Sequence, residues 1–282
     1  MTTTAPGQDR VTRQLAGDVS ELAAHLTDRY VGPAPLPRVA IVTATGRKLA
    51  RFALSGIMTH VRSIDDTAAM TGIWDHASGP VATLIHGVGG PSADRLLITA
   101  LMQGVRAFIR IGTCGLVRSS APIGTVLVAE EATSDDTSFG WYARALREQG
   151  RELIDGRFIA SDAALAATAK HALAAELAAG AADHGRVYST SLLLREGPGA
   201  LEEYRRLGCL GADMECGSVL ACAAWYQIPA IGLLIGADHI EGGAFYTSQR
   251  DRFMAGVSAL RTAVDAILPV AQQHAAAIAD AG

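Results

Sequence analysis

The chain is poor in aromatic and charged residues and has no apolar segment long enough to span a membrane. Phe, Trp and Tyr make up 5% of its 282 residues, and charged residues make up 18%. No run of about 18 apolar residues occurs, so no transmembrane helix is expected. Residues 1–22 are polar and lack the apolar core of a signal peptide. With a net charge of −4, the chain is not expected to bind nucleic acid or membranes in general, and we expect it in the cytoplasm.

Cysteine is also scarce, and its spacing argues against a metal site. The four cysteines form no CxxC pair and have no paired histidines nearby, so no zinc site is expected. All four lie in apolar or glycine-rich surroundings, which favours buried, reduced thiols over a catalytic cysteine. They are Cys114, Cys209, Cys216 and Cys222.

Apolar residues and glycine are plentiful, and their arrangement predicts an α/β fold. Hydrophobic residues make up 49% of the chain, with 30 glycines. Short runs that are apolar on both faces predict buried strands covered by helices on each side. These strands are expected at 39–44, 81–86, 107–112, 125–130, 185–190 and 230–238, and helices at 11–29, 92–103, 162–180, 198–207, 215–226 and 250–279, with a kink or break at Pro269. The alternation predicts one α/β domain over residues 29–282, preceded by a tail and short helix in residues 1–28.

A glycine-rich turn follows one of the predicted strands. Residues 85–93 read IHGVGGPSA, and Gly87, Gly89 and Gly90 form a tight connection from strand to helix. Backbone N–H groups freed at such a turn can bind an anion. Such turns are equally common as purely structural features of α/β proteins.

An arginine lies inside another apolar strand. In FIRIGTCGLV (108–117), Arg110 is surrounded by apolar residues, and Thr113 follows at the strand end between Gly112 and Gly115. A buried arginine must either pair with a carboxylate or point into a site, because burying it alone costs several kcal/mol. With a hydroxyl and exposed backbone amides, Arg110 would suit a phosphate or a carboxylate.

Three acids lie at strand ends. Asp213 and Glu215 stand where a strand meets the apolar helix in LGADMECGSVLACAAW (210–225), and Asp238 ends the apolar strand AIGLLIGAD. Acids in a first helical turn are favourable as caps, but the apolar residues that follow indicate that Glu215 points into a semi-buried site. Asp238 is a candidate general acid or base, or else a cap of the following loop.

In this order, these motifs resemble the nucleoside phosphorylase family that includes hexameric purine nucleoside phosphorylase and uridine phosphorylase. The likeness covers roughly residues 25–275. It rests on the turn from Gly87 to Ser92, on RIGTCG at 110–115, on Asp213-Met-Glu215 and on Ala-Asp-His at 237–239. The resemblance implies a mixed central sheet flanked by helices on both faces. It also implies cleavage of a nucleoside by inorganic phosphate into a free base and ribose 1-phosphate, without a metal or redox cofactor, in a dimer-based homo-oligomer of up to six chains.

The resemblance also assigns roles to individual residues. It places Glu215 on the ribose 2′- and 3′-hydroxyls and Asp238 at N7 of the leaving base, where Arg250 assists it. The residues implied to bind the nucleoside are His25, Thr113, Cys114, Gly115, Leu193, Ala212, Asp213, Met214 and Glu215, and those implied to bind phosphate are Lys48, Arg110 and Thr113.

The chain departs from the family pattern at several of these positions. Ala44-Thr-Gly-Arg47-Lys48 stands where the family has a loop that begins Gly-Asp-Pro and ends in an arginine, and Thr67 stands where it has an arginine that the partner subunit donates. A lysine does not reproduce the bidentate fork of an arginine. Leu193 replaces the aromatic residue that stacks on the base. The chain lacks the insertion with a Gln-x-Arg clamp for uracil, which favours a purine.

These departures leave alternatives to a purine nucleoside phosphorylase. A nucleoside hydrolase on the same fold would use water in place of phosphate. A phosphorylase of uridine or of a modified nucleoside would differ only in the base. A third alternative, from another class, is a protein that binds nucleosides without turnover or serves as a partner subunit in a mixed oligomer.

Overall fold

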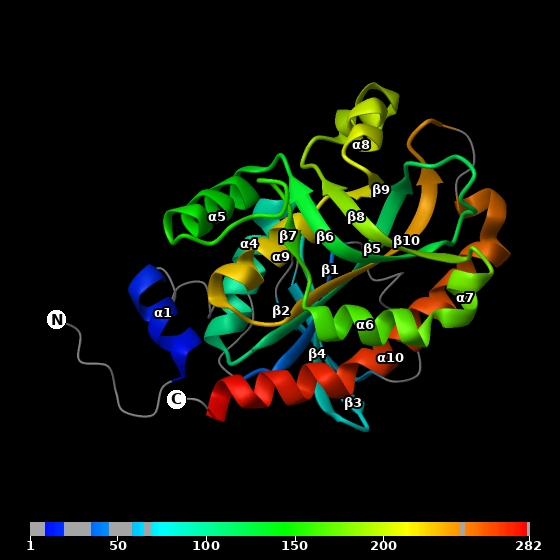
Figure 1. Ribbon diagram of the computed structural model, residues 1–282. Coiled ribbons are helices and arrows are strands. Elements are labelled where there is room, and N and C mark those ends of the chain that lie inside the picture. Colours follow the sequence, from blue (N-terminus) through cyan, green and yellow to red (C-terminus); the bar gives the residue numbers. More distant parts are fainter. Residues whose placement is uncertain (1–8, 20–34, 45–57, 65–68, 243–245, 281–282) are drawn as a thin grey trace.

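The apolar runs of the sequence become strands of one mixed sheet (Figure 1). The computed structural model describes residues 9–19, 35–44, 58–64, 69–242 and 246–280. All six predicted strands are present, β9 lies at the predicted strand end before Asp213, and β2, β3 and β7 were not predicted. The strands are β1 (Val39–Thr43), β2 (Met58–Ile64), β3 (Ala69–His76), β4 (Gly79–Ile85), β5 (Ala107–Leu116), β6 (Val126–Ser134), β7 (Ile159–Ala160), β8 (Ala182–Ser189), β9 (Cys209–Asp213) and β10 (Ala230–His239).

Part of the sheet closes on itself. The strand order is β10-β6-β8-β9-β5-β1-β4-β3-β2, and β10 pairs with β5 as well as with β6. Strands β5, β9, β8, β6 and β10 therefore form a ring, from which β1, β4, β3 and β2 extend as an open sheet. Because β1, β4 and β10 all run parallel to β5, the carboxyl ends of these four strands lie at the same edge.

Helices cover both faces of the sheet, as predicted. They are α1 (Arg10–Val19), α4 (Gly90–Met102), α5 (Thr137–Glu148), α6 (Ala163–Ala172), α7 (Ala174–Ala178), α8 (Leu201–Arg206), α9 (Cys216–Tyr226) and α10 (Arg250–Asp280). Helix α5 was not predicted, and the helix predicted for 162–180 is two helices. The helix predicted for 11–29 is present as α1, and residues 20–29 lie outside the described part of the chain.

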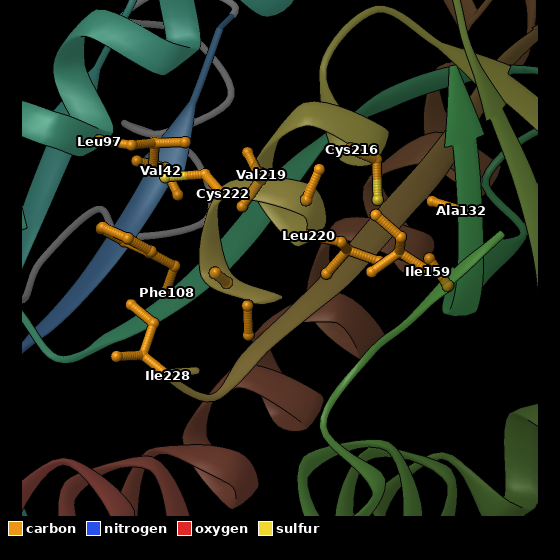
Figure 2. Packing of buried hydrophobic residues seen from close by; sticks show 14 of the residues in the cluster. Val42, Leu97, Phe108, Ala132, Ile159, Cys216, Val219, Leu220, Cys222 and Ile228 are labelled. Carbon is orange, nitrogen blue, oxygen red and sulfur yellow. The ribbon is translucent and has the colours of Figure 1, made fainter. Parts of the chain in front are cut away.

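Three apolar clusters fill the space between the sheet and the helices. The first joins the sheet to α1, α4, α5 and α9, the second joins it to α6 and α10, and a third, smaller one joins it to α8. Figure 2 shows the first cluster, in which Val219 and Leu220 of α9 lie among side chains such as Val42, Phe108 and Ile159. All four cysteines are free and buried, so the prediction of buried, reduced thiols is confirmed.

The last helix is the longest element of the fold. Helix α10 runs unbroken through Pro269, so the predicted possibility of a break there is wrong. It is long and apolar enough to cross a membrane by length and composition alone. One of its faces, however, is buried in the second cluster through residues such as Leu260, Val264 and Leu268. This is the pattern of a core helix, with Pro269 on the exposed side.

Candidate active site

Arg110 of β5 is the central charge of the candidate site. The residue is 1% exposed, and its guanidinium lies over Gly112. A Cβ atom at Gly112 would lie 2.6 Å from both terminal nitrogens, so a larger residue there would displace the guanidinium. Nη2 lies 2.6 Å from Oε2 of Glu215 and 3.3 Å from Oδ2 of Asp213, and Nη1 donates to the carbonyl oxygen of Ile111. The buried arginine therefore pairs with two carboxylates.

Glu215 joins Arg110 to the glycine-rich turn. Its second oxygen, Oε1, accepts a hydrogen bond of 2.6 Å from the backbone N–H of Gly89. Gly89 has a φ of +92°, a conformation that residues with a side chain rarely adopt. The structure thus brings together the turn, the arginine strand and the acidic segment that the sequence singled out.

Asp213 acts as the cap that the sequence left open as an alternative. Its side chain accepts hydrogen bonds from the backbone N–H groups of Glu215 and Cys216, at 3.2 and 3.0 Å, where α9 begins. The hydroxyl of Ser189, at the end of β8, donates to it at 2.5 Å. Asp213 therefore fixes the backbone that carries Glu215 and has its hydrogen-bonding capacity met within the protein.

Asp238 lies on the other side of β5 from the acidic segment. Gly115 of β5 pairs with Asp238 of β10 on one side and with Ala212 of β9 on the other. A Cβ atom at Gly115 would lie 3.7 Å from Oδ1 of Asp238. Asp238 is half-buried, and this burial raises its pKa, although the neighbouring His239 opposes the shift. Closure of the strand ring therefore sets Asp238 beside the strand ends that carry Arg110 and Asp213.

The other predicted site residues fall into four groups. Thr113, Cys114 and Ala212 lie on the same strand ends, and Met214 follows β9 directly. Arg250 is exposed at the start of α10 and, in the described part of the chain, makes no ion pair with Asp238. Leu193 begins a short 3₁₀ helix, Leu193–Glu196. His25, Arg47, Lys48 and Thr67 lie outside the described residues.

Electrostatically, the described site holds more negative than positive charge. Arg110 faces two carboxylates, so the three groups carry a net charge of −1 when all are ionised. Burial raises the pKa of Glu215; the charge of Arg110 opposes this shift and that of Asp213 adds to it. Although burial alone would lower the pKa of Arg110, the two carboxylates raise it. Arg110 therefore stays charged and favours the ionised form of Glu215.

His86 was not predicted as a site residue. It follows β4 directly, is 4% exposed, and its Nδ1 lies 2.6 Å from the carbonyl oxygen of Gly87. Burial and the positive charge of Arg110 lower its pKa to about 3. The only sequence signal was a lone histidine directly before the glycines of the turn, which also fits a structural role.

Three buried polar atoms around the turn lack a hydrogen-bond partner among the described residues. They are Nε of Arg110, Nε2 of His86 and Oγ of Ser191. Ser191 lies beside the turn, since a Cβ atom at Gly89 would be 3.6 Å from its Oγ. Buried polar atoms in native proteins are nearly always paired. Three unpaired atoms in one place make the turn a candidate ligand site.

The described residues offer no rival centre of this kind. They contain no cluster of His, Cys, Asp and Glu that could hold a metal ion. A cavity of about 400 Å³ lies beyond the carboxyl end of α9, far from the strand ends that carry the site. Its charged side chains are already engaged, because Arg151 donates to the carbonyl of Ala224 and His274 lies 3.5 Å from Asp162.

Comparisons with known proteins agree with this geometry. The model of the phosphorylase superfamily matches residues 38–281. A DeoD-type 2 purine nucleoside phosphorylase of Vibrio cholerae is 27% identical over 202 residues, which cover 71% of this chain and 81% of the relative. A DeoD-type purine nucleoside phosphorylase of Tolumonas auensis is 26% identical over 223 residues, covering 78% and 89%. The crystal structure of uridine phosphorylase from Vibrio fischeri has a TM-score of 0.69 at 18% identity and covers 82% of this chain and 91% of its own, which shows a common fold.

Fold, site and comparisons together define an enzyme of the pentosyltransferase class. The chain belongs to the phosphorylase superfamily, and the resemblance to the nucleoside phosphorylase family is confirmed.

Proposed function

We propose that the protein cleaves a purine nucleoside with inorganic phosphate, giving the free base and ribose 1-phosphate. One observation carries the proposal: Arg110, Glu215 and the Gly89 turn meet at one edge of the sheet, with Asp238 a strand away. An anion site, a sugar-binding carboxylate and a proton donor are the groups that phosphorolysis of a nucleoside requires.

In this proposal Glu215 holds the sugar. An ionised carboxylate accepts hydrogen bonds from two adjacent hydroxyls, and the ribose 2′- and 3′-hydroxyls form such a pair. Arg110 favours the ionised form, and Gly89 holds the carboxylate in place. With the ribose fixed, an oxygen of a phosphate bound near Arg110 would face C1′ in line with the base.

Asp238 serves as the general acid. A phosphate oxygen bonds to C1′ as the C1′–N9 bond breaks, and the electron pair of that bond goes to the purine. The proton of Asp238 goes to N7, so that the base leaves neutral, and Asp238 regains a proton from solvent. The raised pKa of Asp238 favours the protonated form that this step needs.

A purine is the proposed base for two reasons. The chain has no insertion with a uracil clamp between β8 and Glu215. The relatives from Vibrio cholerae and Tolumonas auensis are purine nucleoside phosphorylases. Leu193 stands where the family has an aromatic residue, so base stacking would be weaker than in the family pattern.

Hydrolysis is the second candidate, and one observation favours it. Arg110 pairs with two carboxylates in the described site, and their combined negative charge opposes a dianion such as phosphate. Lys48, which would offset this charge, lies outside the described residues. Water carries no charge and would meet no such opposition.

The setting of the enzyme is part of the proposal. A dimer-based homo-oligomer, of up to six chains, follows from the family resemblance, as do independence of metal and redox cofactors and a place in the cytoplasm. The relatives from Vibrio cholerae and Tolumonas auensis support an assignment among bacterial nucleoside phosphorylases.

The test follows base release from inosine, adenosine and uridine, with and without phosphate, and assays ribose 1-phosphate. We expect phosphate-dependent release from the purine nucleosides. Asp238→Asn should lower turnover of inosine about a hundredfold or more. It should have little effect on an N7-alkylated purine nucleoside, whose base already carries the positive charge. The variant Glu152→Gln, at an exposed acid, is the control.

Three outcomes would contradict the proposal. Equal base release without phosphate would make the protein a hydrolase. Uridine as the preferred substrate would exclude the purine assignment. Tight binding of nucleosides without turnover would indicate a binding protein.

A further inference from the structure

His86 lies on the same face of the sheet as Arg110. Arg110 of β5 is level with Val42 of β1, and Val42 is level with Leu84 of β4. In parallel strands, level residues point to the same face, and so do residues two apart along one strand. His86, two residues beyond Leu84, therefore shares a face with Arg110. The guanidinium lies over Gly112, which is two residues beyond Arg110, just as His86 is two residues beyond Leu84. The guanidinium is therefore at the same level along the strands as His86.

Only a small side chain separates the two groups. The backbone N–H of His86 donates to the carbonyl of Thr43 at 3.0 Å, which continues the pairing of β4 with β1 and sets Ala44 between the imidazole and the guanidinium. Two strand spacings separate β5 from β4, or roughly 10 Å. A tetrahedral oxyanion with a hydrogen bond at each end spans a distance of this order.

The contacts of His86 determine which ring nitrogen carries the proton. A carbonyl oxygen can only accept, so Nδ1, at 2.6 Å from the oxygen of Gly87, must be the donor. The pKa of about 3 keeps the ring neutral near pH 7. Nε2 therefore presents a lone pair and can only accept a hydrogen bond. It is buried and lacks a partner among the described residues, so it requires a donor from a ligand.

We propose, resting on the phosphorolysis proposed above, that Nε2 of His86 accepts the hydroxyl proton of bound phosphate and makes the site prefer phosphate to sulfate. Near pH 7 phosphate carries at least one O–H group. Sulfate has none and presents only acceptor oxygens, so its lone pairs would face the lone pair of Nε2. Arg110 alone does not separate the two anions, because both accept from a guanidinium.

The experiment measures the binding of phosphate and sulfate to the nucleoside-free protein by calorimetry. The ratio of the two dissociation constants is compared in wild type, His86→Phe and His86→Gln, with His171→Gln at an exposed histidine as the control. His86→Phe removes the acceptor and should reduce the preference for phosphate about tenfold, mainly by weakening phosphate. His86→Gln supplies an amide oxygen at similar reach and should retain most of the preference.

A second measurement needs no variant. The ¹⁵N signal of His86 Nε2 in the wild-type protein should move upfield when phosphate is added, because an acceptor nitrogen responds to a new hydrogen bond. Sulfate should leave the signal in place. This keeps the test decisive even if His86→Phe does not fold.

Several results would overturn the proposal. An unchanged ratio in His86→Phe, or equal weakening of both anions, would assign His86 a purely structural role. A changed preference between ribonucleosides and their 2′- or 3′-deoxy forms, with the anion ratio intact, would assign the donor to the sugar. Measuring base release with and without phosphate distinguishes a failure of this proposal from a failure of the proposed function. A protein that loses its phosphate preference in His86→Phe but releases base equally well without phosphate would refute phosphorolysis and leave the anion selection standing.

Discussion

At the scale of single residues, the ion pair between Arg110 and Glu215 links the two proposed ligands. Each oxygen of Glu215 is engaged, one by Arg110 and the other by the N–H of Gly89. Ribose hydroxyls would compete with these donors for Glu215, and phosphate would compete with Glu215 for Arg110. Binding of either ligand should therefore release a group that the other one uses, which is a positive coupling between the two sites.

The variant Glu215→Gln tests this coupling. Removing one negative charge beside Arg110 should tighten phosphate binding in the absence of nucleoside, by about tenfold for one charge-assisted hydrogen bond. Nucleoside binding should weaken by a similar factor, because an amide accepts less strongly than a carboxylate. Calorimetry with each ligand alone measures both changes, with Glu152→Gln as the matched control. Weaker phosphate binding in the variant would show that Glu215 supports the anion site instead of competing with it.

The same residues show how far the sequence alone could lead. Arg110 was predictable because a charge inside an apolar strand needs a partner, and Glu215 because an acid precedes an apolar helix. The sequence left open whether Arg110 pairs with a carboxylate or points into a site, and it did not identify Glu215 as the partner. His86 and Ser189 were not predicted, since a lone histidine or serine at a strand end has many structural roles. Their importance comes from contacts with distant segments, which no local pattern contains.

At the scale of elements, the loop after β8 is held by one arginine. Arg195 pairs with Asp135 at 3.2 Å and also with Glu203 of α8, and its carbonyl accepts a hydrogen bond of 2.6 Å from the hydroxyl of Tyr204. The loop thereby connects the end of β6 to α8. It also carries Leu193, at the position where the family stacks an aromatic residue on the base. Arg195 is therefore a positioning residue for the base side of the site.

The variant Arg195→Ala should loosen this loop without touching the reacting atoms. We expect KM for the nucleoside to rise roughly fivefold, equivalent to about 1 kcal/mol for partly exposed ion pairs, with little change in kcat. Steady-state kinetics on wild type, Arg195→Ala and Arg195→Lys measures the split, and Lys should restore part of the loss. Arg205→Ala, which removes an exposed ion pair with Glu241, is the control. A fall in kcat at constant KM would place Arg195 nearer to the chemical step.

The elements themselves were predictable where composition is extreme. Six strands were found from apolar runs, and α9 from a segment that is apolar all round because it is buried on all sides. Helix α5 was not predicted, although its buried residues Phe139, Tyr142, Ala143 and Leu146 recur at helical spacing, because polar and charged residues between them keep its composition mixed. Strands β2 and β3 belong to the open end of the sheet. Pairing of β10 with both β5 and β6 joins segments about a hundred residues apart, which periodicity does not reveal.

At the scale of the whole molecule, the closed ring of strands holds Asp238 in a half-buried position. The burial of this acid lowers the stability of the folded protein. Asp238 is half-buried between β5 and the loop after β10, and the described residues give it no ion-pair partner. Its pKa in the folded protein lies above the ordinary value of 3.8 because burial disfavours the charged form. The rest of the fold must supply the free energy that holds the acid there. Active-site residues often lower the stability of the fold because their positions are set by the needs of activity.

The pH dependence of unfolding follows from this raised pKa. Below pH 3.8 Asp238 is protonated in both states, and its burial costs no stability through ionisation. As the pH rises, the unfolded chain loses the proton first, so stability is lost until the pH passes the raised pKa of the folded state. The loss grows with the difference between the pKa values of the folded and unfolded states, and solvent around the half-buried carboxyl limits it. Asp238→Asn has no charge to bury and avoids this loss.

Asp238→Asn should therefore be more stable than wild type near pH 7 while turning over inosine far more slowly. Urea unfolding of both proteins at pH 4 and pH 7 measures the effect, and the advantage of the variant should grow between the two values. Glu152→Gln, at an exposed acid, should show no such growth. Equal stability differences at the two pH values would mean that Asp238 ionises in the fold as freely as in the unfolded chain. In that case Asp238 would lack the retained proton that the proposed acid catalysis needs, so a single titration bears on both stability and mechanism.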